Sequence, residues 1–173
     1  MGWLDFLRNP AVDSDPSQLR KLQALLPDSV VHSLTERITA SEALHSGEIC
    51  ICVEYSMPSA FTEAQATPRQ RALELFSSLR VWDTEYNNGV LLYVLHDQHA
   101  IEVVADRGFN RHVSAAQWQS VVTDMQAPLQ QGQLAAALHA AIDAVTALLV
   151  THFPPQPHLP RYNDVPNTPV LLG

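Results

Sequence analysis

The chain has 173 residues, a hydrophobic fraction of 46% and a formal net charge of −8 at pH 7. This length and apolar content are enough for one compact domain with its own core. The acidic balance argues against a nucleic-acid-binding protein, because such a protein needs a basic patch or stripe to contact phosphates. With only two cysteines, the chain also lacks the composition of a disulfide-stapled secreted scaffold.

The N-terminal segment carries a short apolar patch at residues 3–7. It lacks the basic start and the long apolar run of a signal peptide, and we expect the patch to dock on the domain or to touch a membrane surface. The longest apolar run, 134–150, is broken by His139 and Asp143, so we expect an amphipathic core helix there and not a transmembrane helix. These features favour a location in the cytoplasm or at the periphery of the inner membrane.

The first half of the chain predicts two helices, a strand and a third helix. Residues 17–26 favour a short helix, and a longer helix follows over 28–44, where apolar side chains recur at helical spacing. In 48–55, isoleucine and valine alternate with cysteine and glutamate, which predicts a strand with two different faces. The run 67–70, Thr-Pro-Arg-Gln, is a capping box with proline at the first helical position.

The second half predicts a hairpin followed by two long helices. Residues 90–95 are apolar throughout, as expected for a central strand that is covered on both faces. The short polar turn that follows makes the next strand, 100–105, antiparallel to it. Helices are predicted over 114–131 and 134–152. Half of the 12 prolines fall after these helices, so we expect the tail 153–173 to be an extended arm that lies on a surface or is disordered.

These elements predict the α/β class, as a three-layer α/β/α sandwich with a small mixed central sheet. We divide the chain into an N-terminal apolar segment with a short helix (1–27), a central domain (28–152) and a proline-rich tail (153–173). The last apolar residues, 170–172, could pack on a neighbour, which would allow a homo-oligomer built through the tail.

The predicted topology brings three polar loops to one edge of the sheet. The connection between the first two strands is long enough for a parallel crossover. The starts of these two strands therefore lie beside the end of the antiparallel third strand. The loops contribute acidic, amide and basic side chains: Glu42, Glu48, Asp83, Glu85, Asn87, Asn88, Asp106, Arg107, Asn110 and Arg111.

Carboxylate and amide oxygens gathered in this way suit a hard cation such as Ca²⁺ or Mg²⁺. Like charges brought together are also costly without a cation between them. The alternative is that these are ordinary capping and surface residues, with Asn88-Gly89 supplying only positive φ for a turn. The candidate metal ligands are Glu42, Glu48, Asp83, Glu85, Asn88 and Asp106.

A phosphate site is a second interpretation of the same edge. Arg107 and Arg111 could hold an anion, or they could simply pair with the neighbouring acids. The sequence contains no Walker loop, serine nucleophile elbow or HExxH motif. A hydrolase would therefore have to use the carboxylates, together with a metal that activates water. The candidate catalytic residues are Asp83, Asp106 and Arg107.

Two segments together resemble the TPM domain family, which includes thylakoid-lumen photosystem-repair proteins and many bacterial proteins. They are RALELFSSLRVWDTEYNNGVLLYVL at 71–95 and IEVVADRGF at 101–109. The shared pattern is a helix with an arginine and a phenylalanine, then Asn88-Gly89 before an apolar strand, then a strand that ends near Gly108. The resemblance covers about 28–150 and implies an α/β/α sandwich.

The resemblance also has implications for function. Some family members are reported as acid phosphatases, and some bind calcium through acids on this edge. Asp83 and Asp106 are the positions carried over first, followed by Glu48. The chain departs from the family in lacking the common signal peptide and membrane anchor. It also has Ala-Asp-Arg-Gly at the exit of the third strand, where many relatives have a glycine-rich sequence.

Three functional hypotheses follow. The first is a divalent-cation-binding interaction module linked to the maintenance of a membrane complex, with an unidentified protein partner, membrane-associated or not, and no nucleic acid. The second is an acid or metal-dependent phosphatase that uses the same acidic edge. The third is a structural interaction module without a ligand site.

Overall fold

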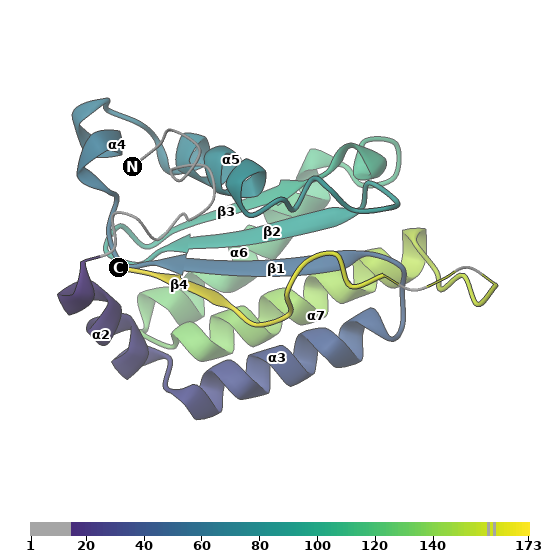
Figure 1. Ribbon diagram of the computed structural model, residues 1–173, viewed down its shortest axis with the longest axis horizontal. Helices are drawn as coiled ribbons and strands as arrows, with labels where there is room; N and C mark the ends of the chain where they lie inside the picture. Colours follow the sequence, from purple (N-terminus) through teal and green to yellow (C-terminus); the bar gives the residue numbers. More distant parts are fainter. Residues whose placement is uncertain (1–14, 159, 161) are drawn as a thin grey trace.

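The computed structural model describes residues 15–158, 160 and 162–173. The elements, in chain order, are α2 (Pro16–Leu25), α3 (Asp28–Glu42), β1 (Glu48–Glu54), α4 (Ser59–Glu63), α5 (Pro68–Ser78), β2 (Gly89–Leu95), β3 (Ala100–Ala105), the 3₁₀ turn η1 (Arg107–Phe109), α6 (Ala115–Gln130), α7 (Leu134–His152) and β4 (Val170–Leu172). Figure 1 shows the strands as one sheet, with β4 beside β1.

The sheet is mixed and has the strand order β3-β2-β1-β4. β1 pairs in parallel with both β2 and β4, and β2 pairs with β3 in an antiparallel hairpin. The parallel crossover and the hairpin confirm the predicted connections. The fold prediction is confirmed as well, since helices pack against both faces of a small mixed sheet.

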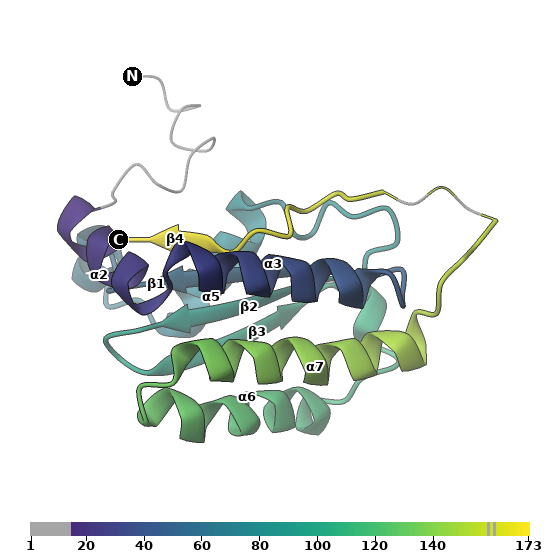
Figure 2. The ribbon, with the colours of Figure 1, turned by 90° about the horizontal axis from the view of Figure 1, so that it is seen from below.

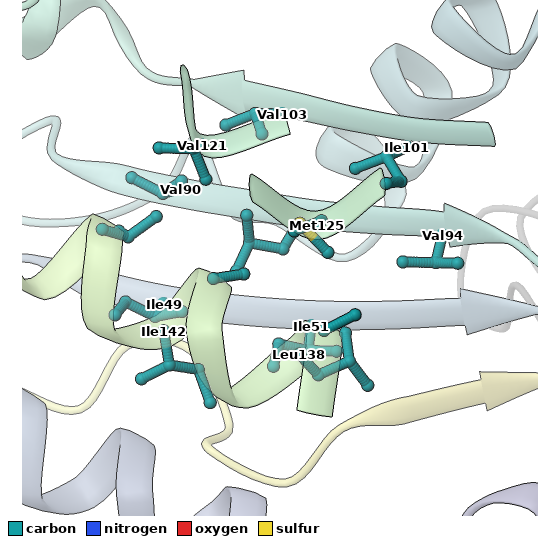
Figure 3. Close-up of a cluster of buried hydrophobic side chains, with 14 of the residues drawn as sticks. Ile49, Ile51, Val90, Val94, Ile101, Val103, Val121, Met125, Leu138 and Ile142 are labelled. Carbon is teal, nitrogen blue, oxygen red and sulfur yellow. The ribbon is translucent and has the colours of Figure 1, made fainter. Parts of the chain in front are cut away.

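The two faces of the sheet bury different cores because successive side chains of a strand point to opposite sides. The larger core joins Ile49, Ile51 and the odd-numbered positions of β3 to side chains of α3, α6 and α7. Figure 3 shows Val121 and Met125 of α6 close to these strands. On the opposite face, Cys50 and Cys52 of β1 and the β2 side chains that point to the same side pack against α5 and the tail. Figure 2 shows α6 and α7 together on one side of the strands.

The two helix starts that were predicted from capping boxes are present. Thr67 Oγ1 accepts the Gln70 N–H while the Gln70 side chain accepts the Thr67 N–H, and Ser114 and Gln117 repeat this arrangement at the start of α6. Each box satisfies two backbone donors that a helix start otherwise leaves unpaired. These local contacts fix where α5 and α6 begin.

The tail differs from the prediction, because its last residues do not remain an arm on the surface. Val170–Leu172 forms β4, which pairs with residues 52–54 of β1, and the Tyr55 N–H donates to the Leu172 carbonyl. Leu172 is buried in the core on the α5 side of the sheet. The short helix α4 was also not predicted. The apolar patch at residues 3–7 lies outside the described residues.

By length and composition, α7 is the one helix in the described part of the chain that could cross a membrane. Core helices pass the same test, and α7 packs in the larger core through Leu138, Ile142, Val145 and Leu149.

A buried ion pair links the end of β1 to α5. Arg71 makes two hydrogen bonds with the Glu54 carboxylate, at 3.0 and 2.6 Å, and the Tyr93 hydroxyl donates to the same carboxylate at 2.7 Å. Arg71 also pairs with Glu74 and stacks on the Phe61 ring. Because every strong polar group here has a partner, the cluster holds α5 in place on the sheet.

We expect Arg71→Leu to destabilise the fold by about 3–5 kcal/mol, because it leaves a buried carboxylate without its counter-charge. Glu74→Gln removes only the more exposed partner and should cost about 1 kcal/mol or less. Urea unfolding of the two variants gives both values. Adding Glu54→Gln to Arg71→Leu should recover part of the loss. A cost for Arg71→Leu no greater than that for Glu74→Gln would contradict a stabilising role.

Candidate functional site

The predicted meeting of three loops occurs at the edge where β1 and β2 begin. In the register of the sheet, Glu48 lies beside Gly89, and Val90 lies beside Ala105. The Asp106 N–H donates to the Gly89 carbonyl at 2.9 Å, and the Gly108 N–H donates to the Asn87 carbonyl at 2.9 Å. These bonds join the exit of β3 to the entry of β2.

Glycine is required at position 89 because another part of the chain comes very close. A Cβ atom on Gly89 would lie 2.1 Å from the Val81 carbonyl oxygen, which no side chain could relieve. The positive φ expected for this turn occurs at Asn87 instead, with a φ of 52°. Glycine is therefore needed at position 89 for close packing of the loop against the start of β2, and not for a positive φ.

Glu48 is buried at this edge of the sheet, with 6% of its surface exposed. Its carboxylate accepts the Val165 N–H at 3.4 Å. Burial, followed by the neighbouring charges of Glu42 and Asp164, raises the pKa of Glu48 to about 8. A proton therefore stays on this carboxyl group at neutral pH unless a cation replaces it.

Asn88 is fully buried beside Glu48 and is only partly satisfied. Its Nδ2 donates to the Ser46 carbonyl at 3.1 Å, and its backbone N–H donates to Thr84 Oγ1 at 3.1 Å. Its Oδ1 atom is buried and has no hydrogen-bond partner among the described residues. A buried acceptor without a donor costs about 1–3 kcal/mol, and the described part of the chain does not supply this donor.

A pocket of about 260 Å³ opens over Glu48 and Asn88, and we name it the edge pocket. The chain leaves α7 at the end of the sheet where β1 begins (Figure 1), and residues 155–157 of this segment belong to the pocket lining. Its described lining residues are His45, Ser46, Gly47, Glu48, Glu85, Tyr86, Asn88, Pro155, Gln156, Pro157, Pro160, Tyr162 and Asp164. This described set contains three acids, Glu48, Glu85 and Asp164, and neither lysine nor arginine.

The structure gathers some of the predicted site residues here and separates others. Glu48, Glu85 and Asn88 line the edge pocket. Glu42 lies behind its floor, where its Oε1 accepts the Ile49 N–H at 3.0 Å. Asp83 is not among the lining residues, and it pairs with Arg80 on the surface.

Asp106 and Arg107 hold the neighbouring loop. One oxygen of Asp106 accepts the Arg107 N–H at the start of η1, while the other oxygen is buried without a partner in the described part of the chain. The Arg107 guanidinium donates twice to Asn87 Oδ1, at 2.9 and 2.7 Å. The Arg107 guanidinium is therefore hydrogen-bonded to the Asn87 side chain, and Arg107 is not among the residues that line the pocket.

Sequence reasoning missed Asp164, Tyr86, Tyr162 and His45. The two tail residues reach the pocket only because β4 returns the tail to the sheet. His45 is buried below the pocket, where its Nδ1 accepts the Gly47 N–H at 3.2 Å and its Nε2 contacts Ser41. No spacing or composition pattern in the sequence marks any of these positions.

The mixed four-stranded sheet with helices on both faces defines a small domain of the α/β sandwich class. Residues 20–148 match the profile of the TPM domain, so the chain belongs to the TPM domain family. The resemblance identified from the sequence is thereby confirmed. No functionally curated protein matches the chain significantly.

Two solved structures are similar in fold. The NMR structure of BA42 protein, from the psychrophilic bacterium Bizionia argentinensis, has a TM-score of 0.73 and 25% identity, with 84% of this chain and 94% of that chain covered. The solution NMR structure of the N-terminal domain of a P. gingivalis protein has a TM-score of 0.62 and 19% identity, with 86% and 98% covered. At 19% identity, the second structure shows similarity of fold only.

Glu48→Gln should stabilise the protein at pH 8 and have much less effect at acidic pH. The unfolded glutamate loses its proton near pH 4.5 and the folded one near pH 8, so wild-type stability falls as pH rises between these values. Because a tenfold change in proton affinity corresponds to about 1.4 kcal/mol, we expect the advantage of the variant to grow by roughly 2–4 kcal/mol across this interval. Urea unfolding at several pH values measures it.

Asp124→Asn, an exposed acid on α6, is the matched control and should show no such pH dependence. A stability difference between Glu48→Gln and wild type that stays constant from pH 4.5 to pH 8 would contradict the environment described for Glu48.

Proposed function

We propose that this TPM-domain protein is an interaction module that binds a divalent cation, Ca²⁺ or Mg²⁺, in the edge pocket. The observation that carries the proposal is a buried carboxyl group with acidic neighbours. Glu48 is buried close to Glu42 and Asp164, and the pocket lining also includes Asn88, whose Oδ1 atom has no donor in the described part of the chain. Carboxylate and amide oxygens are ligands that hard cations prefer.

The charges around the pocket support the same proposal. Burial, followed by the charges of Glu42 and Asp164, raises the pKa of Glu48, and these acids repel one another when they are ionised. A bound cation would relieve this repulsion and replace the proton on Glu48. Cation binding would therefore release a proton below about pH 8 and become tighter as pH rises towards that value.

The ligand set that fits the pocket is partly different from the predicted one. Glu48 and Asn88 would contribute from the floor, and Glu85 and Asp164 from the rim. No three His, Cys, Asp or Glu residues in the described ranges form a ready-made metal cluster. Water molecules would therefore complete the coordination, as they commonly do for Mg²⁺.

A phosphatase has less support at this edge. The described lining of the pocket has no basic side chain to hold a phosphate, and Arg107 is bonded to Asn87. The phosphatase activity and the role at a membrane complex that the family resemblance implies stay predictions. Turnover of a generic phosphomonoester that disappears in Asp106→Asn would favour the phosphatase.

Thermal unfolding at pH 8.5 tests the proposal, with EDTA, Ca²⁺ or Mg²⁺ added. A cation at ~100-fold above its Kd should stabilise the wild type by ~2.7 kcal/mol, which corresponds to a rise in Tm of roughly 5–10 °C. Glu48→Gln should lose most of this rise because it removes the buried anionic ligand.

Asp124→Asn changes the net charge equally and should keep the full rise in Tm. We expect Asp83→Asn to keep it as well, since Asp83 does not line the pocket. The absence of any rise with millimolar cation, or an equal rise in Glu48→Gln and wild type, would overturn the proposal.

A further inference from the structure

β3 is the last strand on one side of the sheet, and half of its backbone groups are not used by β2 (Figure 1). The Asp106 N–H donates to the Gly89 carbonyl, so these residues form a hydrogen-bonded pair that continues the antiparallel register of β2 and β3. Such pairs alternate along the ladder with pairs whose N–H and C=O groups point away from the neighbouring strand. The residues of β3 that present their backbone groups outward are therefore Ile101, Val103 and Ala105.

We propose that two copies of this protein pair through β3, antiparallel and about a two-fold axis at Val103, so that their sheets join into one. The hydrogen bonds, charges and shape of this strand edge each fit a second copy of the same chain. The surface shares no described residue with the edge pocket, so the inference goes beyond the proposed function and does not depend on it.

The outward backbone groups of the two copies complement each other in this register. Val103 faces Val103 of the second copy, and Ile101 faces Ala105. Each facing pair can exchange two N–H···O=C hydrogen bonds, which is what an added strand supplies to an exposed sheet edge. In a single copy the Arg69 guanidinium donates to the Val103 carbonyl at 2.6 Å. The Val103 N–H of the second copy would replace this donor and free Arg69 for another contact.

The charges beside the edge supply that contact. Glu102 and Val104 point to the α5 side of the sheet, where Arg69 Nη1 lies 3.5 Å from Glu102 Oε2. In the proposed register Glu102 of the second copy faces Val104, next to the Val103 carbonyl that Arg69 occupies. Each arginine would therefore lie beside the glutamate of the other copy. Such an arrangement repeats itself about a two-fold axis, and its charges are complementary.

The α6 side of the edge has apolar surface that a second copy would cover. A pocket of about 480 Å³ opens along β3, and its apolar lining includes Ala105, Phe109, Val113, Trp118 and Val122. Facing side chains of an antiparallel pair point to the same side of the sheet, with Cβ atoms about 4.5–5.5 Å apart. Ile101 of the second copy, which faces the small Ala105 side chain, would therefore place its apolar side chain against this pocket.

Sedimentation velocity of the full chain at low salt, from micromolar to millimolar concentration, tests the inference. We expect the wild type to form a dimer as its concentration rises. Arg69→Glu gathers only acids at the junction, and Glu102→Arg gathers only arginines. Because like charges are then opposed, each variant alone should dimerise about tenfold more weakly or less. An equimolar mixture of the two variants should form a heterodimer, which native mass spectrometry identifies by its mass, because each acid then faces an arginine.

Arg37→Glu and Asp143→Arg form the matched control pair. These two residues make an exposed ion pair between α3 and α7, and neither lines the pocket along β3. The control variants change the charge of the chain in the same way as the test variants. We expect each of them to dimerise like the wild type, and their mixture to show no preference for the heterodimer.

Ala105→Pro provides a variant that does not depend on charge. It removes an outward N–H that β2 does not use and adds a ring at the edge, a position that tolerates proline. Added to both test variants, it should abolish their heterodimer, while thermal unfolding checks that the chains still fold.

Four results would overturn the inference. They are a wild type that stays monomeric at millimolar concentration, a dimer that both charge variants leave unchanged, a test mixture with no more heterodimer than the control mixture, and stronger self-association of Arg69→Glu. The last result is expected if Arg69 only shields the edge from other strands. None of them bears on the proposed cation site, since the test of that site follows Glu48.

Discussion

The parallel pairing of β1 with β2 is the constraint on which the candidate site depends. It sets Glu48 beside Gly89, and the absence of a side chain at Gly89 allows the loop at Val81 to close against the strand. Asn88 is then held by Ser46 and Thr84 at the same edge. A shift of one residue in this register would turn every side chain of β1 to the opposite face, so the larger core of the protein and the edge pocket depend on the same pairing.

The two ends of β1 carry buried glutamates in opposite situations. Glu54 is paired with Arg71 and accepts the Tyr93 hydroxyl, so its charge is satisfied within the fold. Glu48 has no basic partner among the described residues, and its neighbours Glu42 and Asp164 are acids. An internal ion pair stabilises a domain only when the charges compensate each other. Glu54 therefore serves the structure as an ion pair, while Glu48 holds a proton at neutral pH, and we propose that a bound cation replaces this proton.

Much of the fold could be predicted from the sequence because its signals are local. The apolar run of β2, the alternation in β1 and the two capping boxes each mark an element within a few residues. The shared edge followed from the parallel crossover and the hairpin. β4 could not be predicted, since three apolar residues after a proline-rich stretch carry no periodic pattern. Because β4 was not predicted, the contribution of Asp164 and Tyr162 to the pocket could not be predicted either. The surface pairing of Asp83 with Arg80 depends on side-chain positions that residue spacing does not encode.

The most direct measurement of the central claim is the pKa of the Glu48 carboxyl group, followed by ¹³C NMR of its side chain with and without saturating cation. The account predicts a pKa of about 8 in the free protein. Bound positive charge should lower this pKa into the range of about 5–7. A pKa near 4.5 in the free protein, or a raised pKa that saturating cation leaves unchanged, would contradict the claim that the edge pocket is built to bind positive charge.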